Sequence, residues 1–148
     1  MNPFDLKAAL LARHAQHVVL IHFPIALFLV GVAFDFAARW KRNAALAAAS
    51  YYNLTIAAIA SVPAVVTGLA AWQWQLEGQR LKGTLLFHLV FGLSSSVLIW
   101  LTWLLHYRGR KPGREPSQYR FVLEGIAIVV VALTAHLGGF LSGVNAPV

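Results

Sequence analysis

The chain contains no cysteine and only five acidic residues among its 148 positions. The absence of cysteine excludes disulfides, thiolate metal ligands, covalently attached haem and iron–sulfur clusters held by cysteine. Charged residues of both signs make up 11% of the chain, whereas 59% of it is hydrophobic. A soluble domain carries far more charge, so the composition predicts a membrane protein.

Four long apolar runs dominate the sequence. Each reaches the roughly 20 residues that a helix needs to cross the hydrocarbon core of a bilayer. The predicted spans cover residues 18–38, 44–72, 83–105 and 121–141. We therefore expect an all-α fold, an integral membrane four-helix bundle of up-down topology, formed by residues 17–148. Residues 1–16 lack a signal-peptide pattern and are expected to form an interfacial N-terminal segment.

The basic residues are unevenly divided between the two sides of this predicted bundle. The two connections on one side of the predicted bundle hold eight of the twelve basic residues, which are Arg39, Lys41, Arg42, Arg108, Arg110, Lys111, Arg114 and Arg120. By the positive-inside rule this side is cytoplasmic, and both termini are expected on the outer side. No basic run is interleaved with aromatic residues, so nucleic acid is not an expected partner.

Three histidines lie within the apolar runs, namely His22, His88 and His136. At a rise of about 1.5 Å per residue they lie roughly 9 to 13 Å from the residues that flank the outer ends of their spans. Ionisable side chains at such depth usually face the bundle interior and mark a functional path. Because the three depths match, we expect one shared site in the outer half of the membrane.

Small residues share helix faces with these histidines. Gly92 follows His88 by four positions, and Gly139 follows His136 by three, which places each pair on one face of its helix. Such faces let helices pack tightly, and they also leave space for a flat cofactor. The two uses cannot be separated from the stripes alone, so Gly92 and Gly139 are candidate cofactor-binding residues.

Imidazole is a good axial ligand for haem iron. In an up-down bundle the first and third helices lie diagonally opposite, which favours His22 and His88 as the two ligands of one non-covalent haem b. His136 is the alternative ligand for either. His17 lies five residues before His22, about 140° around a regular helix, so the two cannot share an iron. We expect His17 at the interface, near the edge of a haem.

Three further polar residues lie toward the cytoplasmic ends of the spans. His106 has no other histidine at its level, so a second haem is not expected, and His106 is interpreted as an interfacial residue. Asp35 and Glu124 are expected to pair with Arg39, Arg120 or lipid headgroups.

The segment His17-Val-Val-Leu-Ile-His22-Phe23-Pro24-Ile25-Ala26-Leu27, followed by Asp35, resembles the opening of a bacterial membrane protein family labelled domain of unknown function 2231. The run from Thr134 to Leu141, with its glycine pair, is similar to the family's closing segment. The chain departs from the family at Val18, where proline is usual, and in its less aromatic ending from Ser142 onward. The resemblance implies a multi-pass protein of the bacterial inner membrane.

The family's helix-borne histidines are similar to those of membrane b-type cytochromes, and some relatives carry Rieske-type iron–sulfur domains. Both likenesses imply electron transfer. We therefore expect an electron carrier or an oxidoreductase subunit, working with a quinone or another membrane redox partner. One alternative is a copper or iron site without haem, built from His17, His22, His88 and His136, which requires the first helix to unwind near Pro24 so that His17 can join the others. Another is a cofactor-free accessory subunit of a larger respiratory complex.

Overall fold

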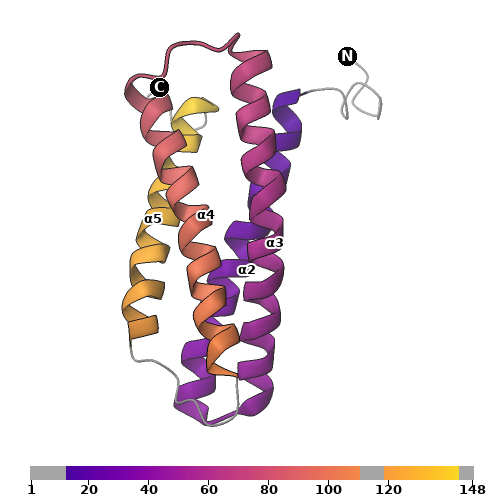
Figure 1. The fold of residues 1–148 in the computed structure, drawn as a ribbon, viewed down its shortest axis with the longest axis vertical. Helices are drawn as coiled ribbons and strands as arrows, with labels where there is room; N and C mark the ends of the chain where they lie inside the picture. The colour runs from indigo at the N-terminus through magenta and orange to yellow at the C-terminus, as the bar shows by residue number, and fades with distance from the viewer. Residues whose placement is uncertain (1–12, 111–118, 144–148) are drawn as a thin grey trace.

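The computed structural model describes residues 13–110 and 119–143, which form four long helices in an up-down bundle (Figure 1). The helices are α2 (Arg13–Lys41), α3 (Ala44–Gln75), α4 (Gly83–Gly109) and α5 (Tyr119–Leu141). All four are long and apolar enough to cross a membrane. The predicted all-α membrane bundle is therefore confirmed. Residues 1–12 of the predicted interfacial segment lie outside the described residues, and residues 13–16 form the first turn of α2.

Local sequence signals set the ends of α3. The side-chain oxygen of Asn43 accepts hydrogen bonds from two backbone N–H groups of the first turn, at 2.8 and 3.2 Å, and so caps the helix. After its last turn the chain reverses at Gly78, whose φ of 64° suits glycine. The indole N–H of Trp72 donates to the carbonyl of Gln79 at 2.9 Å, which fixes the connection to α4.

The four helices pack as two hairpins. The most extensive contacts join α2 to α3, which we call the first hairpin, and α4 to α5, the second hairpin. The hairpins meet mainly through α3 and α4, whereas α2 and α5 touch little. As a result α2 and α4 lie diagonally opposite, as the up-down topology predicts.

The two ends of the bundle differ in chemistry. One end, at the bottom of Figure 1, is where α2 and α4 finish and α3 and α5 begin. We call it the basic end, because its described residues include Arg39, Lys41, Arg42, Arg108, Arg110 and Arg120. The opposite end contains the connection from α3 to α4 together with His17 and His88, and we call it the histidine end.

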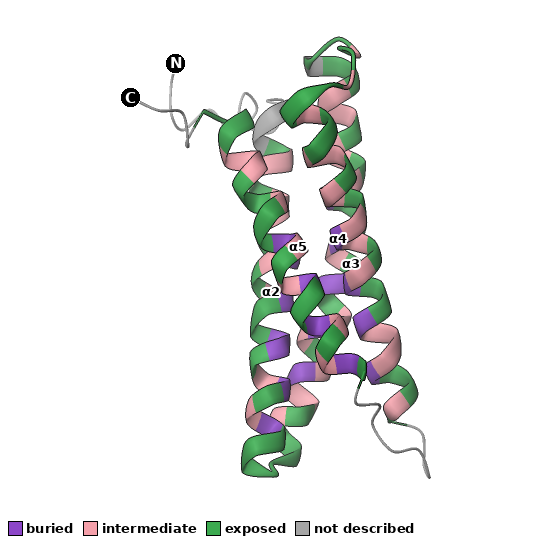
Figure 2. Ribbon diagram, turned by 90° about the vertical axis from the view of Figure 1, so that its left-hand side faces the viewer, coloured by how far each residue is buried: buried purple, intermediate pink, exposed green. Residues whose placement is uncertain are grey.

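The hydrophobic core occupies only the half of the bundle nearer the basic end (Figure 2). Its buried residues are Phe28, Val32, Leu54, Ala57, Ala58, Ile99, Ala127 and Val131. The last buried positions toward the histidine end are Pro24, Ala64, Ser95 and Val131, one on each helix. Among the described residues, none beyond these four is buried. Large apolar side chains are instead exposed along all four helices, as expected for surfaces that face lipid.

Candidate functional site

Two histidines from diagonal helices face one another at the histidine end. The ring centres of His17, on α2, and His88, on α4, are 6.5 Å apart, and the ring planes are inclined by 82°. Both side chains are half-buried. We call these two residues the histidine pair.

The first hairpin holds the imidazole of His17 against α3. Its Nδ1 lies 3.3 Å from Oγ1 of Thr67, and that hydroxyl donates to the carbonyl of Pro63 at 2.8 Å. Because the hydroxyl proton points to Pro63, the Thr67 oxygen accepts a hydrogen bond from Nδ1–H of His17. Gly68 lies alongside, and a Cβ atom there would be 2.8 Å from Cε1 of His17. Glycine is therefore what allows the ring to lie so close to α3.

The second hairpin holds His88 in a similar manner against α5. Nδ1 of His88 lies 3.2 Å from the backbone carbonyl of Thr134. A carbonyl only accepts, so Nδ1 of His88 bears the proton and donates it. A Cβ atom at Gly138 would be 3.1 Å from Cε1 of His88. Only glycine therefore lets the His88 ring lie this close to α5 without a shift. The Thr134 hydroxyl also pairs with Oγ of Ser95 at 2.8 Å.

The two hairpins thus repeat one arrangement. Each places a histidine on its first helix and a threonine and a glycine on its second helix, which hold that histidine through Nδ1 and Cε1. With Nδ1 engaged in both rings, a metal bound by this pair would be held through Nε2 of each ring. Thr67 and Gly68 are adjacent in the sequence of α3, but Thr67 lies 50 residues from His17. Helical spacing relates residues of one helix only, so it did not predict their contact with His17.

The structure corrects the prediction that three histidines share one interior site. His22 and His136 are exposed on the surface of the bundle, not inside it. Nδ1 of His22 lies 2.6 Å from the carbonyl of Val18 on its own helix, and the His136 ring packs edge-on against Phe140 at 5.0 Å. Five residues of helix separate His17 from His22, so only one of them can face inward. The structure turns His17 inward, whereas the sequence argument placed it at the interface.

The two candidate glycines are near the histidine pair but do not touch it in the way Gly68 and Gly138 do. A Cβ atom at Gly92 would meet a methyl group of Thr134 at 3.8 Å, an ordinary packing distance. Gly139 is half-buried, and the glycine against His88 is its neighbour Gly138. The glycine that allows the close approach to His88 is therefore Gly138, and whether Gly92 and Gly139 contact a cofactor stays a prediction.

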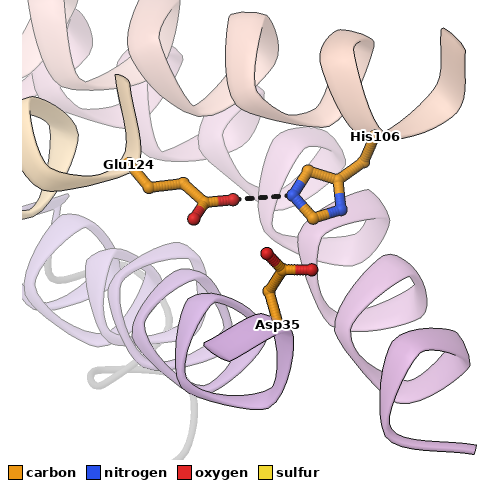
Figure 3. A group of neighbouring side chains, drawn as sticks. All are labelled: Asp35, His106 and Glu124. Atoms are coloured by element: carbon orange, nitrogen blue, oxygen red, sulfur yellow. Dashed lines mark hydrogen bonds and ion pairs between the residues drawn. The ribbon is translucent and has the colours of Figure 1, made fainter. Parts of the chain in front are cut away.

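A second polar cluster lies buried toward the basic end, between α2, α4 and α5 (Figure 3). Nε2 of His106 lies 2.7 Å from Oε1 of Glu124. The prediction that His106 is an interfacial residue is wrong, since only 6% of it is exposed. It lies on the face of α4 that also buries Ser95, Ile99 and Thr102. The absence of a second histidine at the same level led the sequence argument to the wrong placement.

The carboxylate of Asp35 completes this buried cluster. Both of its oxygens accept from the Arg120 guanidinium at 2.7 Å, and Nε of Arg39 lies 3.8 Å away. The predicted pairing of Asp35 with these two arginines is confirmed, whereas Glu124 pairs with His106 instead. Donor atoms of Asp35, His106 and Glu124 lie within 4.8 Å of one another. The guanidinium of Arg120 on both Asp35 oxygens opposes a cation among them.

Fold and site together define a small α-helical multi-pass membrane protein with a histidine pair between two hairpins. The model of a family of predicted membrane proteins, DUF2231, matches residues 13–145, and the chain belongs to this family. The family's description gives a membrane protein and no activity. No curated protein and no solved structure matches the chain.

Proposed function

We propose that this protein is an integral membrane b-type cytochrome with one non-covalent haem, held by His17 and His88 at the histidine end. The observation that carries the proposal is the histidine pair itself, two imidazoles from diagonal helices whose ring centres are 6.5 Å apart. The assignment replaces His22 with His17, because His22 is exposed and His17 is turned toward His88.

The separation of the rings suits two ligands of one metal ion. A metal–nitrogen bond of about 2.0–2.1 Å on each side, with roughly 1.1 Å from each nitrogen to its ring centre, puts the two centres about 6 Å apart. The observed 6.5 Å is within a few tenths of an ångström of that value. The donor set consists of imidazole nitrogens, and the chain has no thiolate to compete with them.

The surroundings of each imidazole support a ligand role. Metal-binding histidines usually donate their second ring N–H to a carbonyl or another acceptor, which fixes the ring orientation and raises its basicity. His88 donates to the carbonyl of Thr134, and His17 donates to the hydroxyl of Thr67. Each ring would therefore bind a metal through Nε2.

The interior of the histidine end also supports a cofactor between the hairpins. None of its described residues is buried, and small residues, Gly68 and Gly138, lie against the two rings. A flat macrocycle needs this kind of small-residue surface on both sides. If the bundle were complete without a ligand, we would expect the core to extend to this end, as packed interiors do.

A haem at this position would supply one-electron transfer between a quinol or other membrane partner and an acceptor at the same side of the membrane. The chain's own contribution is to hold two imidazoles in one tautomer and one orientation. By the positive-inside rule the basic end would be cytoplasmic. The histidine end would then lie toward the outer side of the bacterial inner membrane, with both chain ends outside.

Absorbance spectroscopy of the detergent-purified protein, oxidised and then reduced, tests the proposal. We expect a Soret band and a haem-to-protein ratio near one by pyridine haemochrome. His17→Ala and His88→Ala should lower that ratio by at least about tenfold. His22→Ala and His136→Ala are matched controls, since they remove a histidine at similar depth, and they should leave the ratio unchanged. Wild-type protein without haem, or equal losses in all four variants, contradicts the proposal.

The same pair could instead hold a copper or iron ion without a porphyrin. The observation favouring this alternative is that a 6.5 Å separation suits two imidazoles on any such ion. Elemental analysis distinguishes the two, because a bare-metal site would give one metal per chain with no Soret band. Loss of that metal in His17→Ala and His88→Ala would locate it at the pair.

A further inference from the structure

An open cavity of about 630 Å³ lies at the basic end, far from the histidine pair. Four of its lining residues are arginines, Arg39, Arg42, Arg110 and Arg120, and its only described acidic lining residue is Asp35. Small alanines of α2 and α3 form much of the remaining wall. The cavity is thus wide, positively charged and open, and the histidine pair has no part in it.

The arginines of the cavity are held in place by neighbouring side chains. The guanidinium of Arg39 lies over the ring of Phe121 at 4.1 Å, and that of Arg110 lies over the ring of Tyr51 at 4.2 Å. Stacking of this kind limits the rotamers of long side chains before any ligand arrives. These arginines are therefore better ordered for binding than free surface residues would be.

Acidic residues of the lining do not balance the positive charge of its arginines. Asp35 is bound through both oxygens by Arg120, at 2.7 Å, and Nε of Arg39 lies 3.8 Å from it, so it has little capacity left for Arg42 and Arg110. The described lining residues have three more positive than negative charges when His106 is neutral. An anionic ligand would supply the missing charge.

We propose that this cavity binds a phosphate group, through Arg39, Arg42 and Arg110 at its mouth and Arg120 at its base. Guanidinium groups bind phosphate oxygens through paired N–H donors and in any protonation state of the protein. A volume of about 630 Å³ exceeds the needs of a single phosphate and lies within the range of ordinary ligand pockets. The occupant is therefore a phosphate carried on a larger molecule.

The position of the cavity favours the headgroup of an anionic phospholipid as the carrier. The lining comes from the last turns of α2 and α4 and the first turns of α3 and α5, which is where helices leave the hydrocarbon region. Basic pockets between helices at this level bind lipid headgroups. A soluble phosphate ester would present the same chemistry from the aqueous side. The cavity shares no residue with the histidine pair. Loss of phosphate binding and absence of haem would therefore be separate results.

Native mass spectrometry of the detergent-purified protein, with added phosphatidylglycerol or phosphatidylethanolamine, tests the lipid source. We expect the anionic lipid to bind at least about tenfold more tightly than the zwitterionic one. Arg42→Gln with Arg110→Gln should weaken that binding by at least about tenfold, since two phosphate donors are lost. Calorimetry with glycerol phosphate tests the soluble source, and binding of this ester with the same sensitivity to the double variant would also support the site.

A matched control separates the cavity from the general positive charge of this end. Lys41→Gln with Arg108→Gln removes the same charge from exposed residues that do not line the cavity, and it should leave binding within about twofold of the wild type. Equal weakening in both double variants would overturn the proposal, and so would the failure of both probes to bind. Circular dichroism would verify that all variants keep their helix content.

Discussion

Replacing Gly68 with alanine tests whether His17 is held against α3 as the structure has it. The new Cβ atom would lie 2.8 Å from Cε1 of His17, whereas carbon atoms in contact prefer about 3.5–4.0 Å. The ring must therefore move by roughly 0.7 Å or more. The bond from His17 to Thr67 is already 3.3 Å long, so such a shift breaks it.

The expected cost of Gly68→Ala follows from these displacements. A ring forced off its rotamer costs about 0.5–1.5 kcal/mol, and a lost hydrogen bond costs about 0.5–1.5 kcal/mol. Alanine returns about 1 kcal/mol through its higher helix propensity. The net effect on stability is a loss of about 0–2 kcal/mol. If His17 is a ligand, the affinity for the cofactor should also fall about 10- to 100-fold.

Gly125→Ala provides the matched control, because a Cβ atom at Gly125 has no neighbour within 4 Å. It receives the same gain in helix propensity without the clash, so the two variants should differ by about 1–3 kcal/mol. Thermal unfolding in detergent measures this difference, and the haem-to-protein ratio measures the effect on the site. Equal unfolding midpoints for the two variants would refute the close packing of His17 on α3.

Three further predictions concern other parts of the bundle, and thermal unfolding in detergent measures each of them. Asp35→Asn should destabilise the protein by about 3–5 kcal/mol, because it leaves Arg120 buried without its counterion. The double variant Asp35→Asn with Arg120→Gln should lose less stability than the sum of the two single variants. Additive losses would contradict a stabilising ion pair between Asp35 and Arg120. Glu124→Gln should cost about 1–3 kcal/mol by weakening the bond to His106, and an unchanged midpoint would show that this bond contributes nothing. Asn43→Ala should cost about 1 kcal/mol through loss of the α3 cap, and Asn43→Asp, which keeps the acceptor, should restore stability.

The sequence alone was sufficient for the architecture, because the lengths of the apolar helices follow directly from the thickness of a bilayer. It was not sufficient to orient α2. Residues 18–21 and 23–34 are all apolar or glycine, so this part of the helix has no polar face to reveal which histidine points inward. Their angular separation was predictable, and the direction of each was not.

The cluster at the basic end shows a different limit. The helical spacing of Thr102 and His106, and of Arg120 and Glu124, was visible in the sequence. However, the bond from His106 to Glu124 joins α4 to α5. Such pairings depend on the rotation of each helix about its own axis, which only packing determines.

The position of the hydrophobic core at one end of the bundle has a consequence for how the molecule moves. Separating the hairpins at the histidine end exposes no fully buried side chain among those described, so a local opening there costs much less free energy than global unfolding. The turns around Phe28 and Leu54 would remain closed during such an opening. A bulky planar molecule could then enter sideways from the lipid while the far half stays folded. Amide hydrogen exchange would be fast near one end and slow near the other.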